Sequence, residues 1–317
     1  MSLHQEFHSA FTAGDMLKLD LSATATVKNG DLGVFGAVHY RFPVGMSGGF
    51  GEVFAGNVIA KRSATGTLLA TDIRGNSTVL AYGFPVTRSI DSFGYVIGEL
   101  RQSGTDVDVS GTLYNSDVRT AGLSWIYGKA LENGGSFEYA LNVAAGRRTS
   151  AAVGFDDGDQ SFSYLRFGFG GQFPLGNPES NTAIRAEFWG QYSPDRLPKS
   201  EEFILGGRED ERGYAFSEAS GDTGISATLA VSRDLYPDSG WVQHYRPFAF
   251  LDVGHVKNNN PGTTEVASAT LASVGVGVNA DFTNGFSSRV HLAVPLRDGP
   301  RTRKGSSALY LSLTRSW

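Results

Sequence analysis

The sequence contains no cysteine and only three methionines among its 317 residues. Without cysteine, disulfides, thiolate metal sites and cysteine nucleophiles are all excluded, and the chain suits an oxidising compartment. No stretch approaches the roughly 18–20 consecutive apolar residues that a membrane helix needs. The first residues show neither the basic nor the apolar region of a signal peptide. We therefore expect no spanning helix. An outer-membrane protein must be exported, so either these residues are a fragment without its leader or a membrane location is wrong.

Charge of either sign is also sparse. The net charge is −5 and the pI is near 5.7, so there is no basic surface for nucleic acid. The six histidines show no metal-ligand spacing, and the acidic residues at 201–202 and 209–211 lack the regular alternation of a calcium loop. We read Asp156–Asp159 as a surface turn. The sequence predicts neither a metal nor a cofactor.

What the sequence does contain is glycine, at 41 residues, and long segments in which apolar and polar residues alternate. In the segment 181–192, Ile184 and Phe188 share one face. Arg185 and Glu187 lie on the opposite face. A period of two residues is typical of β-strands. A soluble sandwich would bury the apolar face in its core, whereas a membrane barrel would present it to lipid.

Strand length favours the membrane. Globular strands average about five or six residues and tilted membrane strands need about 9–11. Most segments reach the second figure; they lie near 15–27, 31–42, 48–60, 75–86, 92–103, 108–115, 118–130, 135–148, 161–173, 181–192, 222–235, 244–257, 268–281, 285–296 and 306–317. The short 108–115 segment is either continuous with a neighbour or part of a loop, which leaves about fourteen strands.

Connections alternate between tight turns, such as 281–285, and long loops, such as 193–221. Short turns at one end and long loops at the other are the asymmetry of outer-membrane barrels. No linker or low-complexity segment divides the chain. We predict one all-β domain over 1–317, a transmembrane antiparallel β-barrel in the bacterial outer membrane.

Two motifs carry specific information. The long loop contains two glycines followed by an arginine turn with an aromatic neighbour: Gly206, Gly207, Arg212, Gly213 and Tyr214. A later strand places Phe250, Asp252 and Gly254 on one face, opposite Leu251 and Val253. If the second face meets lipid, Asp252 points into the lumen, where a carboxylate needs a cation.

The loop resembles the sixth-loop motif of the barrel-assembly and two-partner-secretion superfamily, and Phe250-x-Asp252-x-Gly254 resembles the strand motif that accompanies it. The resemblance implies that the loop folds into the lumen and that Arg212 contacts Asp252. Glu211 stands where the family favours valine, and its charge could offset or compete with Asp252. The segments 191–203, 221–224, 40–45, 84–88 and 293–296 are similar to the hemolysin-activator transporters of two-partner secretion (TpsB).

TpsB barrels have sixteen strands, preceded by two POTRA domains and a plug helix. The resemblance therefore implies that about fourteen of those strands are present here and that the POTRA domains, the plug helix and the first strands are not. The terminal Trp317 would be the signal for the barrel-insertion machinery.

The resemblance further implies a pore that exports a large secreted partner protein of the hemolysin or adhesin type, unfolded and without ATP, from a membrane of lipid and lipopolysaccharide. An assembly factor of the same superfamily and a passive porin remain alternatives. A barrel-embedded hydrolase would need a Ser/His pair, for which His291 with a nearby serine is available, but no G-x-S-x-G motif is present. We expect no enzyme and no catalytic residue.

Overall fold

The structure is a computed structural model that describes residues 2–26, 31–62, 71–151, 158–176, 181–238, 240–262 and 265–315. Trp317 and residues 156–157 of the acidic turn lie outside the described residues. Every regular element within the described ranges is a β-strand, which confirms the all-β prediction. The described part of the chain has no helix with the length and apolar character to cross a membrane.

The strands are β1 (Ser2–His8), β2 (Met16–Thr26), β3 (Asp31–Val44), β4 (Gly49–Arg62), β5 (Thr71–Arg88), β6 (Ser92–Val109), β7 (Thr112–Ala130), β8 (Ser136–Ala151), β9 (Ser161–Pro174), β10 (Thr182–Tyr192), β11 (Phe203–Leu205), β12 (Ala219–Gly221), β13 (Thr223–Arg233), β14 (Val242–Lys257), β15 (Ser268–Phe282), β16 (Phe286–Pro295) and β17 (Ala308–Arg315). Among the described residues, fifteen strands form one sheet in the order β1 to β10 and then β13 to β17. The short β11 and β12 pair separately, inside the long loop.

The count of about fourteen strands differs from the fifteen of this sheet. The additional strand is β1, whose seven residues pair antiparallel with β2. The segment 108–115 is not a strand of its own, because it contains the end of β6, a two-residue turn and the start of β7. Ser110 and Gly111 form that turn with φ of 51° and 91°, the left-handed backbone that two-residue hairpins require.

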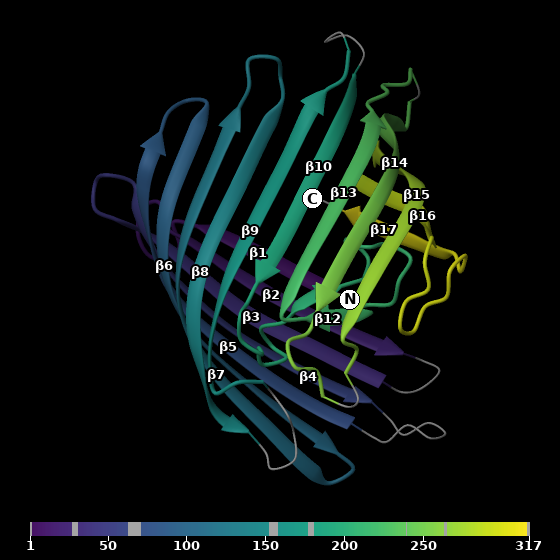
Figure 1. The fold of residues 1–317 in the computed structure, drawn as a ribbon. Coiled ribbons are helices and arrows are strands. Elements are labelled where there is room, and N and C mark those ends of the chain that lie inside the picture. The colour runs from purple at the N-terminus through teal and green to yellow at the C-terminus, as the bar shows by residue number, and fades with distance from the viewer. Residues whose placement is uncertain are drawn as a thin grey trace. The chain divides into compact units, whose positions relative to one another are not determined.

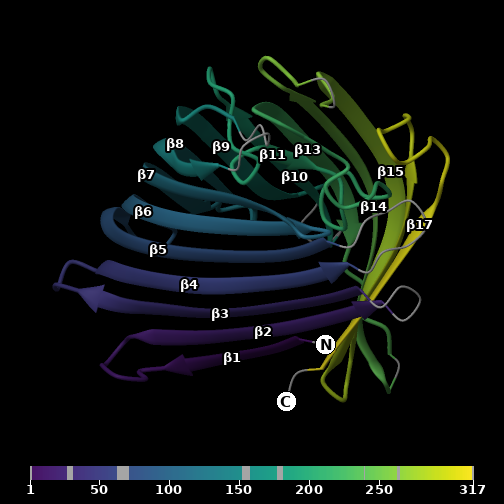
Figure 2. The ribbon, with the colours of Figure 1, turned by 90° about the horizontal axis from the view of Figure 1, so that it is seen from below.

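Contacts divide the chain into two compact units. The first comprises Met1–Arg88, Phe93–Ile126 and Asn142–Ser163, and the second comprises Ser89–Ser92, Tyr127–Leu141 and Tyr164–Trp317. In the first unit β1 to β5 lie side by side in chain order (Figure 2).

The turn from β1 to β2 in the first unit is built on a buried carboxylate, that of Asp15. It accepts hydrogen bonds from three backbone N–H groups at 2.6–3.0 Å, those of Ala10, Phe11 and Thr12. The hydroxyl of Tyr40 on β3 adds a fourth bond, at 2.8 Å. These bonds position the short strand β1 next to β2.

In the second unit, β9, β10, β13 and β14 lie side by side (Figure 1) and their faces differ in chemistry. On β14, Phe250 and Asp252 are buried, whereas Leu251 and Val253 on the other face are exposed. On β17, Leu309 and Leu311 are 70% and 72% exposed. The apolar face is thus not the core of a sandwich. A continuous exposed apolar surface of this kind is favourable in lipid and unfavourable in water.

Candidate functional site

The candidate site is the long loop between β10 and β13, which lies on the polar face of the sheet in the second unit. Polar side chains fix the loop where it leaves and rejoins the sheet. The buried carboxylate of Asp222 accepts the backbone N–H groups of Leu197 and Asn259, each at 2.6 Å. Gln191 at the end of β10 donates to the carbonyl oxygens of Glu201 and Asp222 at 3.0 and 3.1 Å. The loop therefore leaves and rejoins the sheet at one place.

Ion pairs strengthen this stem of the loop. Lys199 lies 2.7 Å from both Glu202 and Glu265, and Arg196 lies 2.8 Å from Glu265. Burial acts to raise the pKa of Glu265, but the hydrogen bond from Lys199 and the nearby Arg196 outweigh it and lower the pKa to about 2. Of the acidic residues at 201–202 and 209–211, Glu202 is buried in this stem, whereas Glu209 is 61% exposed. Among the described residues, no three His, Asp or Glu side chains come together as metal ligands.

Beyond the stem, the chain makes a tight turn that carries the predicted arginine. Gly206 and Gly213 take φ of +88° and +98°, a left-handed backbone in which a side chain is strained. An isolated bridge joins Gly207 to Arg212. This compact fold brings the backbone and side chain of Arg212 to β14.

Arg212 and Asp252 form a two-pronged ion pair. The guanidinium donates from Nε to Oδ2 at 2.9 Å and from Nη2 to Oδ1 at 2.7 Å. The backbone N–H of Arg212 donates to the same carboxylate at 3.1 Å. The guanidinium carbon also lies 3.3 Å from the ring centre of Phe250, a cation–π contact. The structure thus brings together Arg212 and Asp252, the two residues that the resemblance pairs, and adds Phe250 of the strand motif to them.

The surroundings of the pair are dry. The side chain of Asp252 is 0% exposed and that of Arg212 is 12% exposed. The hydroxyl groups of Thr228 and Ser273 donate to the carboxylate at 2.9 and 3.4 Å. A buried ion pair whose partners share two charge-assisted hydrogen bonds is costly to break from one side, by about 3–5 kcal/mol.

Tyr214 docks the next residues of the loop onto β15. Its hydroxyl lies 2.9 Å from the carbonyl oxygen of Ala272 and 2.8 Å from that of Arg297. It also accepts the N–H of Ala272 at 3.2 Å. The ring joins Leu205 and Leu271 in a small buried cluster. This aromatic anchor accounts for a tyrosine directly after the arginine turn.

Tyr310 on β17 is a contact that the sequence analysis missed. Its hydroxyl accepts the N–H of Gly213 at 3.0 Å and donates to the carbonyl of Gly207 at 3.2 Å. Its ring stacks on His291, with centroids 4.6 Å apart. The only signal in the sequence is its place on the polar face of the last strand. The two ring nitrogens of His291 have no hydrogen-bond partner among the described residues, so no serine is paired with it there.

Glu218 is a second contact that was missed. Its buried carboxylate accepts the N–H groups of Arg301 and Thr302 at 2.6 and 2.7 Å. It also accepts the hydroxyl of Thr302 at 2.7 Å and the N–H of Ala215 at 3.2 Å. Burial acts to raise the pKa of Glu218, but these hydrogen bonds outweigh it and lower the pKa. The β16–β17 loop is therefore clamped over the end of the arginine turn.

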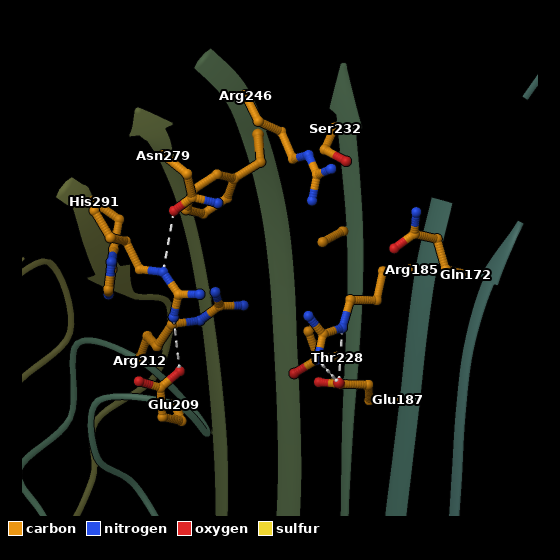
Figure 3. Close-up of a pocket in the computed structure, with 13 residues that line it drawn as sticks. Gln172, Arg185, Glu187, Glu209, Arg212, Thr228, Ser232, Arg246, Asn279 and His291 are labelled. Carbon is orange, nitrogen blue, oxygen red and sulfur yellow. Dashed lines mark hydrogen bonds and ion pairs between the residues drawn. The ribbon is translucent and has the colours of Figure 1, made fainter. Parts of the chain in front are cut away.

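A polar pocket lies beside the docked arginine (Figure 3). Side chains from β9, β10, β13, β14, β15 and β16 and from the loop line it, and most of them are amides or charged side chains of either sign. Arg289 on β16 donates to Asn279 of β15 at 3.1 Å and to Glu209 of the loop at 3.3 Å. Arg246 pairs with Asp234 at 2.6 Å. Such a wall is hydrophilic and carries charges of both signs, four arginines and two glutamates.

The chain resembles known proteins in its fold and in part of its sequence. Comparison with curated proteins finds no match. The fold is similar to CdiB from Acinetobacter baumannii, with a TM-score of 0.81 and 17% identity over 100% of this chain and 56% of that chain. CdiB from Escherichia coli is similar with a TM-score of 0.80 and 16% identity, over 98% of this chain and 58% of that chain.

The crystal structure of BamA from Haemophilus ducreyi lacking POTRA domains 1–3 is also similar, with a TM-score of 0.67 and 14% identity over 99% of this chain and 67% of that chain. The chain thus spans less than two thirds of the length of the CdiB chains. The model of the family of haemolysin secretion/activation proteins ShlB/FhaC/HecB matches residues 104–280, which include both Arg212 and Asp252. This match covers more than half of the sequence, and the chain belongs to that family.

Proposed function

We propose that the protein containing this chain exports a large partner polypeptide across the bacterial outer membrane. The partner is of the secreted hemolysin or adhesin class and passes in unfolded form along the polar face of the strands. The step uses no ATP and no covalent chemistry. The observation that carries the proposal is the family match over 104–280, because that stretch contains the docked arginine turn.

The two faces of the sheet support a membrane location for this activity. Leucine and valine side chains remain exposed on one face, as lipid contact requires, while ion pairs and amides occupy the other. An unfolded polypeptide exposes backbone N–H and C=O groups, which need polar partners during transit. The mixed charges beside Arg212 offer such partners without holding one sequence tightly.

The docked loop supplies the gate in this proposal. Arg212, Tyr214 and Glu218 hold the loop against β14, β15 and the β16–β17 loop. A chain passing along the same polar face must displace the loop or pass beside it. The arginine turn would therefore be tight enough to close the resting pore, yet held by a limited set of contacts that a partner can replace.

The experiment compares export with insertion. The full-length protein and its secreted partner are produced together, and the partner is measured in the medium. Arg212→Ala is expected to insert normally, shown by heat-dependent mobility of the folded barrel, and to export much less partner. Wild-type export by this variant would contradict the proposed role of the loop. Steady small-solute conductance with no exported partner would instead favour a passive porin.

A further inference from the structure

Glu211, the residue directly before the arginine, is one of the buried acids of the loop. It is 0% exposed and lies under the arginine turn against β13 and β14. Its Oε1 is 2.6 Å from the hydroxyl of Ser226 on β13. Its Oε2 accepts the N–H of Gly206 at 3.0 Å. These two neutral groups are its hydrogen-bond partners in the described part of the chain.

The charged groups that face Glu211 do not neutralise it. Asp210 of the same loop and Asp252 of β14 are both acidic and act against a negative charge at this position. Arg212 is the adjacent cation, but its guanidinium is bound by Asp252 in two places. Among the described residues of β13, Ser226 is the hydrogen-bond partner of Glu211, and it is neutral. The expected competition of Glu211 for the arginine therefore does not occur; its carboxyl group points elsewhere.

The site is shaped for a carboxyl group. Gly254 of β14 has no Cβ, and one built there would collide with the Glu211 carboxyl and lie 2.8 Å from the side chain of Leu205. Glu211 itself takes φ of +36°, a left-handed backbone that costs more for β-branched residues. A valine at this position would thus be strained in this turn. The 2.6 Å to Ser226 fits a carboxylic acid that donates to the serine hydroxyl as well as a serine that donates to a carboxylate.

We propose that Glu211 is a positioning residue that holds the arginine turn on β13 and β14 as a neutral carboxylic acid, so that the loop docks tightly at acidic pH and loosely above neutral pH. This inference deepens the proposed function, because it assigns a pH dependence to the same gate. Ionisation would place an unpaired negative charge in a dry site beside Asp252. Undocking returns that charge to water.

The direction and size of this pH dependence follow from the linkage between ionisation of Glu211 and docking of the loop. Burial raises the pKa of Glu211 to about 7, although Ser226 and Gly206 act to lower it. The docked state thus has the higher pKa, so the stabilisation is complete below the ordinary value of 4.5 and is lost as pH rises through about 7. Between pH 6 and 8.5 the docking equilibrium is expected to weaken about tenfold.

The test is hydrogen–deuterium exchange of the full-length protein in detergent, with each rate divided by the intrinsic rate at that pH. The N–H groups of Arg212 and Gly213 report docking, because Asp252 and Tyr310 accept them. Their protection is expected to fall about tenfold from pH 6 to 8.5 in the wild type. Glu211→Gln, which mimics the neutral acid, is expected to keep the same protection at both pH values.

Glu209→Gln is the matched control, since it removes the same charge two residues away at a side chain that is 61% exposed. It is expected to keep the wild-type slope. Glu211→Met provides a second neutral variant if the glutamine variant does not fold. Protonation of His291 would add positive charge near Arg212, so its titration would make protection rise with pH, opposite to the fall expected from Glu211.

A wild-type protection that is constant with pH, or a Glu211→Gln variant that retains the wild-type slope, would overturn the inference. A failure of the proposed function can be distinguished from a failure of this inference. If the full-length protein exports no partner but shows the tenfold change and its loss in Glu211→Gln, the role of Glu211 stands and the transport proposal does not.

Discussion

Replacing Arg212 by alanine tests the energetics of the docked loop most directly. The substitution removes both prongs of the ion pair and the cation–π contact with Phe250. Asp252, which is 0% exposed in the structure, would lose this cation and keep as donors the hydroxyl groups of Thr228 and Ser273 and one backbone N–H. The perturbation therefore leaves an uncompensated buried charge rather than simply deleting a contact.

The magnitude follows from that burial. Breaking a buried pair from one side costs about 3–5 kcal/mol, and the lost contact with the ring adds about 1 kcal/mol. Asp252→Ala should cost a similar amount. The double variant should cost less than the sum of the two, with a coupling energy of at least about 2 kcal/mol, because neither partner is left alone. Arg212→Lys keeps the charge but loses the fork geometry, so its cost should be intermediate.

The assay is hydrogen exchange at neutral pH on the N–H groups of Gly213 and Tyr214, which the loop's own contacts protect. Arg208→Ala is the matched control. Its side chain is 60% exposed and forms an exposed ion pair with Glu209, so the substitution should change protection by less than about 0.5 kcal/mol. Protection in Arg212→Ala within about 0.5 kcal/mol of wild type, or strictly additive single variants, would refute the energetic role of the pair.

Three further substitutions test the other contacts of the loop. Tyr310→Phe keeps the ring but leaves the N–H of Gly213 without its acceptor, so amide protection of the arginine turn should fall by about 1–3 kcal/mol. Glu218→Gln should loosen the β16–β17 loop by a similar amount. In the wild type, the hydrogen bonds of Glu218 should hold this loop above pH 4.5 and be lost as pH falls through the lowered pKa of Glu218. Hydrogen exchange of residues 300–302, measured over an acid titration, would show this loss. Gly254→Ala should destabilise docking by about 1–3 kcal/mol and be partly rescued by Glu211→Ala; a thermal melt of the double variant that shows no rescue would contradict the packing argument.

Local patterns in the sequence were enough to predict most of the strands and the chemistry of the two faces of the sheet. Alternation is local, so the placement of Leu251 and Val253 on one face and of Asp252 on the other could be predicted from their order alone. The left-handed turn at 110–111 and the short β1 were not predicted, because a two-residue turn and a seven-residue strand give little periodic signal.

The contacts of the long loop depend on the tertiary structure and could not be derived from local sequence patterns. The pairing of Arg212 with Asp252 came from a resemblance, because no spacing rule joins residues 40 positions apart. Tyr310 and Glu218 contact groups that lie more than 80 positions away, and nothing in their own neighbourhoods marks them. The sequence shows a carboxyl group at Glu211, next to Arg212, but not which way that group points. Its two neutral partners, its burial and the missing side chain at Gly254 exist only once the loop lies on β13 and β14, since burial is a property of the packed chain and not of the residue.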